Sequence, residues 1–219
     1  MTYLELVNKV MLRLRENQVT TVQGSGNSNT YARLIGEFVN EAKSQVESAW
    51  DWSAKRTTLT LTTADSIFNY ELTGCKNPST LLNAWNDTSN IEMTYKDAKW
   101  FDQEFLMADP QHGIPTYYSF NGVSTDGDIQ VDIYPIPDGV YNVRFNVVTK
   151  GAALSADSDV LYIPSRPVIL LATAMAIEER GEDGGQQSAN AYGAYRTALA
   201  DEIAADAARH PEETIWYQV

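Results

Sequence analysis

The stretch "YARLIGEFVNEAKSQVESAWDWSAKRTTLTLTT", residues 31–63, changes its hydrophobic period from that of a helix to that of a strand. In its first part, apolar residues recur three or four positions apart, at Tyr31, Ile35, Phe38, Ala42, Val46 and Ala49. This spacing predicts one face of an α-helix from about Tyr31 to Trp52. From Thr57 to Thr63, threonine alternates with leucine, which is the pattern of a half-buried strand. The stretch therefore joins a helical part of the chain to a β-rich part.

Helical spacing also precedes this stretch and returns later in the chain. Within the first sixteen residues, apolar side chains again recur three or four positions apart, at Leu4, Val7, Met11 and Leu14. A further helix is predicted from near Pro167 to about Arg180, because proline is favoured in a first helical turn. The last is predicted over residues 187–209, an alanine-rich segment. Two pairs of amphipathic helices most simply meet as one bundle.

The segment between the helix pairs carries the alternating patterns of strands. Strands are predicted over residues 57–63, 67–72, 81–86, 91–95, 129–133 and 141–147. Residues 96–108 have helical spacing and predict one short helix lying on the sheet. Asp126-Gly127 and Asp138-Gly139 are typical of tight hairpin turns. The middle of the chain is therefore predicted to be an antiparallel sheet.

Together these patterns predict an α+β fold. Residues 1–56 and 164–209 are predicted to form a four-helix bundle from the N- and C-terminal helix pairs. Residues 57–163 are predicted to form an inserted, antiparallel β-rich subdomain, and residues 210–219 a C-terminal docking tail. A chain of 219 residues is long enough for one good-sized domain or two smaller parts.

The formal net charge of −13 restricts the partners of the protein. General binding to nucleic acid through phosphate contacts would require the opposite sign. The charge serves either solubility or the repulsion of a polyanion, and charge alone leaves both open. No apolar run approaches the roughly 20 residues that span a bilayer, and the charged N-terminal stretch lacks the pattern of a secretory signal. We predict synthesis in the cytoplasm and no membrane partner.

The residue types that catalyse reactions or bind metals occur here in weak patterns. Cys75 is the only cysteine, and neither His112 nor His210 has a set of partners around it. A Cys–His nucleophilic pair is therefore not indicated. The alternating carboxylates of residues 126–132 lack the glycine and glutamate that a calcium-binding EF-hand loop requires, so a hairpin turn is favoured. We predict no enzyme, no metal site and no cofactor.

An acidic run, "EERGEDGG" at residues 178–185, surrounds a predicted helix end. Its carboxylates are Glu178, Glu179, Glu182 and Asp183. A metal-binding or acid–base role would need partners that the pattern does not supply, so a solvated loop is favoured. The rival enzyme class is a hydrolase that uses two carboxylates with shifted pKa values, such as Glu178 and Asp126. Nothing in their spacing brings these two together.

The C-terminal stretch "HPEETIWYQV", residues 210–219, is apolar although the protein is acidic. Pro211 ends the preceding helical pattern. Aromatic side chains bury a large area at low entropic cost, and they are enriched in protein–protein contacts. A peptide of this kind docks on its own domain or on another chain. The candidate docking residues are Pro211, Ile215, Trp216, Tyr217 and Val219.

Several of these motifs together resemble a known family. They are "MTYLELVNKVMLRLRE", "LIGEFVNEAKSQVESAWDWS" followed by "RTTLTLTT", "VDIYPIPDGVYNVRFNVV", "LYIPSRPVILLATAMAIEERGEDGG" and "RHPEETIW". In this order they resemble the tail tubular protein A-like head-to-tail adaptors of tailed bacteriophages, over nearly the whole chain. The resemblance carries no catalytic motif.

The resemblance implies a structural virion protein at the head–tail junction. Family members form a twelve-fold ring of identical subunits below the portal, with the helical part against the portal and the other face against the next tail component. In short-tailed phages that component is the nozzle, and fibres or spikes dock near the junction. The resemblance assigns portal contact to residues 210–219. A tail-completion protein further down the tail tube is the alternative.

The same resemblance offers a role for the negative charge. DNA that slides through such a ring passes without specific binding, and an acidic lumen would repel its phosphates. We hypothesise that Glu178, Glu179, Glu182 and Asp183 line the channel, together with residues of the last helix. A structure that places these segments on the outside of the ring would contradict this hypothesis.

Overall fold

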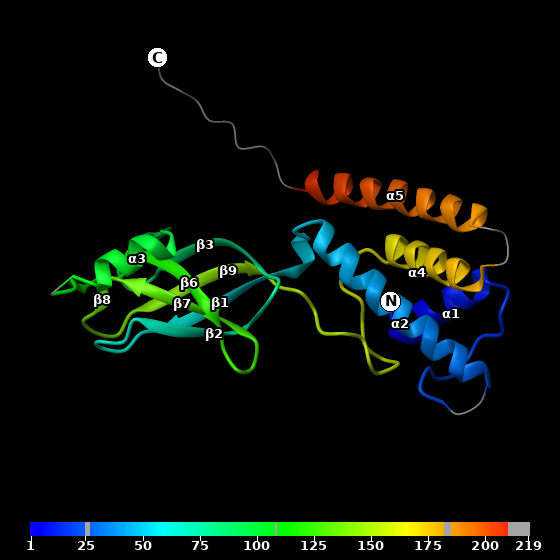
Figure 1. The fold of residues 1–219 in the computed structure, drawn as a ribbon, viewed down its shortest axis with the longest axis horizontal. Coiled ribbons are helices and arrows are strands. Elements are labelled where there is room, and N and C mark those ends of the chain that lie inside the picture. The colour runs from blue at the N-terminus through cyan, green and yellow to red at the C-terminus, as the bar shows by residue number, and fades with distance from the viewer. Residues whose placement is uncertain (25–26, 108, 182–184, 210–219) are drawn as a thin grey trace, which may run out of the picture. The chain divides into compact units, whose positions relative to one another are not determined.

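The computed structural model describes residues 1–24, 27–107, 109–181 and 185–209. The chain divides into two compact units, whose elements are labelled in Figure 1. Unit 1 comprises Met1–Ala54 and Gly151–Val219, and unit 2 comprises Lys55–Lys150. Unit 1 is helical and unit 2 carries a large, mostly antiparallel sheet, which confirms the predicted α+β class.

Four helices make up most of unit 1. They are α1 (Tyr3–Arg13), α2 (Asn27–Ala49), α4 (Ser165–Arg180) and α5 (Gln186–Ala207). α1 begins at a capping box, because the side chains of Thr2 and Glu5 each accept a hydrogen bond from the other's backbone amide. α4 contacts α1, α2 and α5, and α1 also packs on α2. These contacts make α4 the common partner of the other three, and the regular four-helix bundle stays a prediction.

The core of unit 1 combines helical side chains with a returning extended segment. Its fully buried members include Leu6, Val10, Ile35, Val39, Trp52 and Leu171. Residues 151–163, which we predicted in the β-rich insertion, instead belong to unit 1. Leu154, Leu161 and Ile163 of this segment pack into the helical core. Its one ladder contact is an isolated bridge between Thr2 and Val160.

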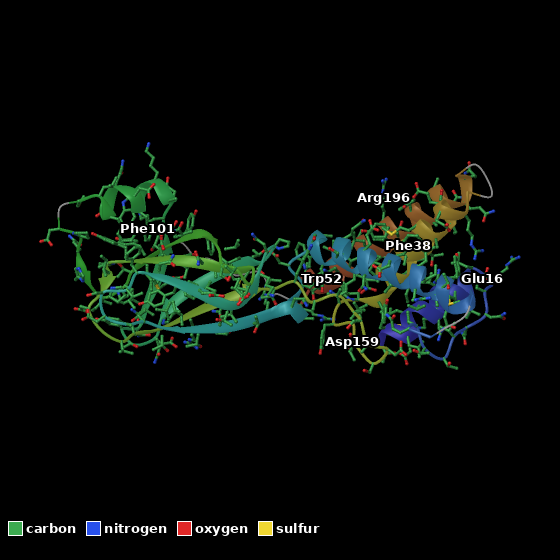
Figure 2. All side chains as sticks on the ribbon, turned by 60° about the horizontal axis from the view of Figure 1, so that its bottom comes forward. Glu16, Phe38, Trp52, Phe101, Asp159 and Arg196 are labelled. Carbon is green, nitrogen blue, oxygen red and sulfur yellow. The ribbon has the colours of Figure 1, made fainter. Side chains whose placement is uncertain are left out.

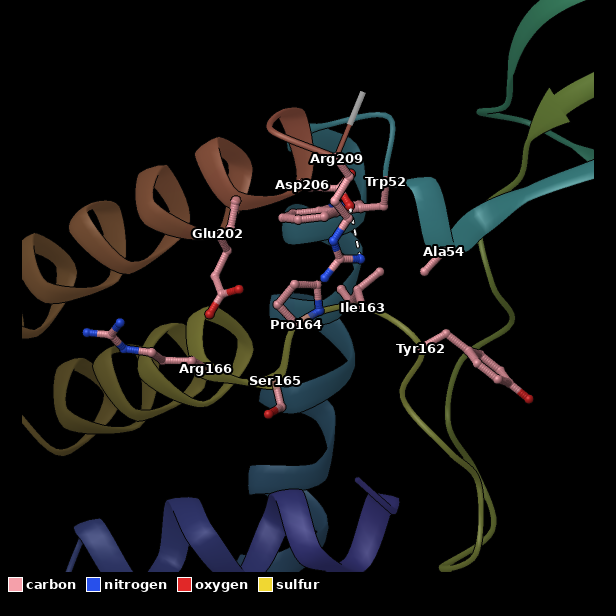
Figure 3. A pocket seen from close by; sticks show the side chains of 11 residues that line it. Trp52, Ala54, Tyr162, Ile163, Pro164, Ser165, Arg166, Glu202, Asp206 and Arg209 are labelled. Carbon is pink, nitrogen blue, oxygen red and sulfur yellow. Dashed lines mark ion pairs between the residues drawn. The ribbon is translucent and has the colours of Figure 1, made fainter. Parts of the chain in front are cut away.

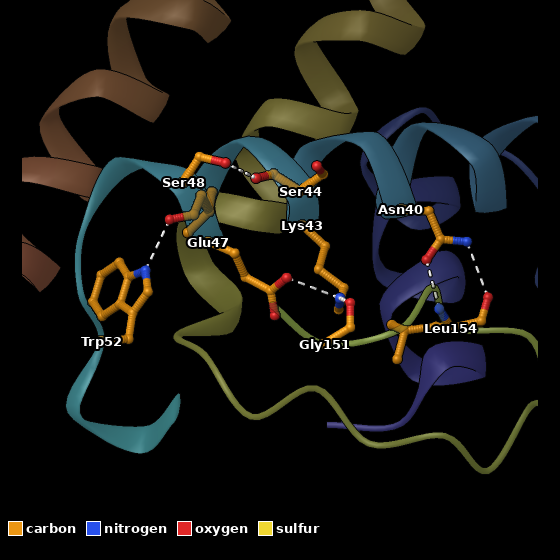
Figure 4. Close-up of polar contacts among 9 residues, drawn as sticks. Asn40, Lys43, Ser44, Glu47, Ser48, Trp52, Gly151 and Leu154 are labelled. Atoms are coloured by element: carbon orange, nitrogen blue, oxygen red, sulfur yellow. Dashed lines mark hydrogen bonds and ion pairs between the residues drawn. The ribbon is translucent and has the colours of Figure 1, made fainter. Parts of the chain in front are cut away.

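Polar side chains of α2 hold the start of that segment in place (Figure 4). Lys43 Nζ donates to the Gly151 carbonyl at 2.9 Å and pairs with Glu47 Oε2 at 3.0 Å. The Asn40 side chain donates to the Leu154 carbonyl and accepts from the Leu154 amide. The side chains of Lys43 and Glu47 are only 7% and 4% exposed, so these contacts offset the cost of burying charge.

Unit 2 is built on a seven-stranded sheet in the order β1-β9-β3-β4-β6-β7-β2. The strands are β1 (Arg56–Thr62), β2 (Asn69–Lys76), β3 (Thr80–Asn86), β4 (Ile91–Tyr95), β6 (Tyr117–Val123), β7 (Asp128–Tyr134) and β9 (Asn142–Val148). All neighbours pair antiparallel except β4 and β6, which pair parallel. Two short strands, β5 (His112–Gly113) and β8 (Ile136–Pro137), pair separately. Helix α3 (Ala98–Phe105) buries Phe101 beneath it (Figure 2).

One of the two predicted hairpins is wrong. The Asp126-Gly127 turn does join β6 to β7 as an antiparallel pair, as we predicted. The Asp138-Gly139 turn does not make a hairpin of β7 and β9, because both edges of β7 are occupied by β6 and β2. β9 pairs instead with β1 and β3. A turn dipeptide fixes the local change of direction but not which strands pair.

Candidate interaction surfaces

The C-terminal end of α5 is fastened to the exit of α2 by a buried carboxylate. Asp206 is only 5% exposed, although it lies in a helix of which few side chains are buried. Its oxygens accept hydrogen bonds from the Trp50 indole at 3.0 Å, from the Ser53 amide at 3.0 Å and from the Ser53 hydroxyl at 2.5 Å. Arg209, which directly precedes the predicted docking tail, also pairs with Asp206 at 3.6 Å. The last turn of α5 is thereby held in a defined place.

The ionisation of Asp206 reflects this set of donors. Burial alone would raise the pKa of its carboxyl group, since it disfavours the charged form. Hydrogen bonds from Ser53 and Trp50, with the nearby charge of Arg209, outweigh burial and lower the pKa below its ordinary value. The charged carboxylate is therefore the form that the fold stabilises.

A surface hollow of about 410 Å³ lies beside this fastening in unit 1 (Figure 3). It is lined by residues of α5, by residues 162–166 and by Trp52. Charges of both signs surround it, from Arg166, Glu202, Asp206 and Arg209. A hollow with mixed charges next to Arg209 suits a polar contact better than an apolar anchor.

A second hollow, of about 490 Å³, carries carboxylates from two helices of unit 1. α2 contributes Phe38, Glu41 and Gln45, α4 contributes Met175, Glu178 and Glu179, and α5 contributes Tyr192. We call this surface the acidic groove. The structure thus brings Glu178 and Glu179 together with Glu41, a residue that was not among the predicted acidic candidates. The helical spacing of α2 gives a partial indication of this position. Glu41 follows Phe38 by three positions, so the two side chains lie on the same side of the predicted helix.

Tyr192 ties α5 to α4 within the acidic groove. Its hydroxyl donates to Glu178 Oε2 at 2.6 Å. Partial burial and the hydrogen bond to Glu178 together raise the pKa of Tyr192 to about 12. The phenol therefore stays protonated across the physiological range and keeps donating to the carboxylate.

All five residues predicted for docking lie outside the described part of the chain. These are Pro211, Ile215, Trp216, Tyr217 and Val219. Glu182 and Asp183, two of the four predicted channel residues, also lie outside it. Glu178 and Glu179 are exposed in the last turn of α4.

Two further residues of the types that catalyse reactions, Asp132 and Cys75, are buried in unit 2. Asp132 is buried and accepts hydrogen bonds from the side chains of Asn69 and Asn121. Cys75 is buried in the sheet core, and burial raises the pKa of its thiol, which disfavours the nucleophilic thiolate. Among residues 1–24, 27–107, 109–181 and 185–209, no three His, Cys, Asp or Glu side chains are grouped so that they could hold a metal ion. The arrangement offers surfaces for contact.

Comparison with protein families gives the decisive observation. The sequence model of the SU10 adaptor protein family matches residues 1–214. The chain belongs to this family. The match spans both units and confirms the resemblance to phage head-to-tail adaptors. No curated protein matches the chain.

Membership of the SU10 adaptor family makes the protein a structural adaptor of a phage and a component of the virion. An adaptor of this kind contacts portal and tail components. Four of the predicted docking residues, Ile215, Trp216, Tyr217 and Val219, lie beyond residue 214, where the family match ends. Of the described helices of this SU10 adaptor, none is both long and apolar enough to cross a membrane.

Proposed function

We propose that this protein is the head-to-tail adaptor that joins the portal to the next tail component, as one subunit of a ring around the DNA channel. The observation that carries the proposal is the family match over residues 1–214. A closed ring of identical subunits is the usual solution when one chain must surround a passage. A dodecamer, and a nozzle as the next component, are the forms that the sequence resemblance implies.

The division into two units supports a joining role. Each unit has its own buried apolar cluster, one built on Leu6 and Ile35 and the other on Val131 and Phe145. Each can therefore offer its own face to a different neighbour. We propose that α1, α2, α4 and α5 act as one four-helix bundle against the portal, while the sheet of unit 2 faces the tail.

We further propose that the tail peptide at residues 210–219 docks on the portal or on the neighbouring subunit. Its anchors are Ile215, Trp216 and Tyr217, flanked by Pro211 and Val219. Asp206 supports this role, because it holds the end of α5 from which the peptide continues. A fixed starting point lowers the ordering cost of docking.

Truncation after Arg209 tests the adaptor function most directly. The truncated chain is expected to keep the circular dichroism spectrum of the full chain and to lose copurification with the portal. Trp216→Ala in the full chain should weaken portal binding by on the order of 2 kcal/mol, as expected of a central aromatic anchor. Unchanged portal binding by the truncated chain would refute the docking role. Copurification with a tail-tube protein in place of the portal would favour a tail-completion protein.

We also propose that the acidic groove faces the channel, together with Glu182 and Asp183. Glu41, Glu178 and Glu179 concentrate negative charge on one surface, and such a surface repels phosphates. Replacement of these three by glutamine should increase DNA retention by the assembled ring at low salt. Equal retention by the variant and the unmodified ring would place the groove elsewhere.

A further inference from the structure

Unit 2 exposes a cluster of large apolar side chains that the adaptor function has not used. Of the thirteen exposed large hydrophobic residues in the described chain, six belong to four segments of unit 2. They are Ile67, Phe68, Leu106, Met107, Ile114 and Val140. We call these six side chains the apolar tip. Leu106 is 83% exposed and Val140 is 68% exposed, so the cluster lies open.

The four segments that carry these side chains meet at one end of the sheet. The pairing of β1 with β9 runs from Arg56 opposite Val148, where the chain enters and leaves unit 2, to Thr62 opposite Asn142. The tip segments adjoin this second end. The Ser66 amide donates to the Pro137 carbonyl at 2.8 Å. The Ile136 amide donates to the Gln111 carbonyl at 2.9 Å.

A cluster of aromatic rings in tilted and edge-on contact supports the tip from inside. Phe68 meets Phe105 at 4.5 Å between ring centroids, and Phe105 meets Phe101 and Tyr134 at 5.6 and 5.8 Å. The Tyr134 hydroxyl also accepts from the Gln111 amide at 3.1 Å. Since backbone and rings are both held, the exposed side chains project from a fixed base. Clustered apolar exposure on a fixed base is typical of an interaction site.

The charges around the tip indicate the kind of partner. Within residues 63–68, 98–107, 109–115 and 134–141, the acidic residues are Asp65, Asp102, Glu104, Asp109 and Asp138, and the only lysine or arginine is Lys99. A second copy docked through the same face would bring two acidic rims together, which disfavours self-association here. A partner with basic residues beside apolar ones fits both features.

We propose that the apolar tip binds a protein segment in which apolar side chains are flanked by lysine or arginine. The identification of that segment with a tail component, and not the portal, rests on the proposed function. The surface itself is argued from unit 2 alone. Met107 and Leu106 lie at the end of α3, where their flexible side chains can adapt to the shape of an incoming segment.

Selection of displayed random peptides on the immobilised full-length protein tests the proposal. Selected peptides should combine large apolar residues with lysine or arginine, and their binding should weaken as salt is raised. Leu106→Asp/Met107→Asp should reduce their affinity by about tenfold or more, because it removes the two most adaptable contacts. Leu82→Asp, at another exposed apolar site of unit 2, should leave the affinity unchanged. All three positions are exposed, so both variants are expected to fold.

The outcomes separate this inference from the adaptor function. Peptides without a basic preference, or peptides that bind the Leu106→Asp/Met107→Asp variant equally well, would overturn the proposal. Self-association of the protein that this variant abolishes would instead make a second copy the occupant. Portal copurification should be the same for the variant and the unmodified protein. Equal peptide binding by the variant and the unmodified protein, with intact portal binding, would refute the tip alone. Peptide binding that depends on the tip, by a protein that does not bind the portal, would refute the adaptor function alone.

Discussion

α4 and α5 are consecutive, alanine-containing helices of unit 1, yet the fold uses them differently. Half of the 16 residues of α4 are buried: Pro167, Val168, Ile169, Leu171, Ala172, Thr173, Ala174 and Ala176. In the 22 residues of α5 only Ser188, Ala198 and Asp206 are buried. Alanine favours the helix in both cases, but the large apolar residues decide which helix is the core. α5 lies on one side of α4, and most of its residues are exposed within the described part of the chain.

The two helices also differ in the kind of contact that holds them. α4 is held by apolar packing against α1 and α2. α5 adds polar fastenings near its two ends, where Tyr192 meets Glu178 and Asp206 meets Trp50 and Ser53. Polar fastenings specify a position more than they add stability. The difference suggests that α5 is positioned for a neighbour, and matched substitutions can test it.

Truncating one leucine in each helix should give the largest difference. Leu171→Ala in α4 removes a side chain that is only 1% exposed and should lower the free energy of unfolding by about 2–5 kcal/mol, since a cavity remains. Leu199→Ala in α5 removes a partly buried side chain and should cost about 1 kcal/mol. Urea unfolding of both variants measures this. Equal losses would mean that α5 is as much a core element as α4.

Asp206→Asn tests the C-terminal fastening of α5. At neutral pH the substitution should cost about 2 kcal/mol, because an amide replaces a carboxylate that accepts three hydrogen bonds. The folded pKa of Asp206 lies below its ordinary value. The stabilisation is therefore complete above the unfolded pKa of about 3.9 and is lost as the pH falls through the folded pKa. The difference between variant and unmodified protein should shrink at acid pH.

Asp201→Asn is the matched control for this measurement. Asp201 lies on the same helix, but its side chain is 60% exposed and it pairs with Arg166 at 3.7 Å. An exposed pair of this kind contributes little, so the control should change stability by less than about 1 kcal/mol. A constant loss for Asp206→Asn at every pH would show that the carboxylate charge is not what holds α5.

Tyr192→Phe tests the fastening near the N-terminal end of α5 and should have a smaller effect. The hydrogen bond to Glu178 is partly solvated, so its loss should cost less than about 1 kcal/mol. The folded pKa of about 12 exceeds the unfolded value of about 10, so this contribution is present below pH 10 and is lost as the pH rises toward 12. Spectrophotometric titration should show one tyrosine fewer at the alkaline end. Tyr195→Phe is the control, and the same loss there would mean that the bond to Glu178 contributes nothing.

The difference between α4 and α5 was only partly predictable from the sequence. The periodicity of Val168, Leu171 and Ala172 predicts a helix with an apolar face, and α4 does span Ser165–Arg180. The pattern of α5 predicts its extent equally well, at Gln186–Ala207. The hydrophobic period of a sequence identifies a helix. How deeply that helix is buried depends on which other helices pack around it. Asp206 shows the limit, because an aspartate is assigned to solvent unless its partners are known, and here they lie 156 and 153 positions away in the sequence.

Long-range pairing limits the rest of the prediction in the same way. Strand β4 was predicted with its observed bounds, Ile91–Tyr95, from alternation alone. The Asp138-Gly139 turn misled because the partners of β9 are β1 and β3, which lie far away in the sequence. The candidate interaction surfaces were harder to predict from the sequence than the strand pairing. Glu178 was predicted as an acidic surface residue, but its neighbour Glu41 comes from α2 and meets it only in the packed unit.

A substitution on the exposed face of α5 is expected to have the smallest effect on stability, and it tests the difference between α4 and α5 most specifically. Ala200 is exposed there, whereas Ala172 of α4 is fully buried. Ala200→Leu should change the free energy of unfolding by less than about 0.5 kcal/mol, because leucine is also a good helix former and the site is open. Ala172→Leu should cost about 1–3 kcal/mol through overpacking. If Ala200→Leu leaves the isolated protein stable but prevents ring assembly, the exposed face of α5 lies at a subunit contact; if assembly is unaffected as well, the small residues of that face serve only the helix itself.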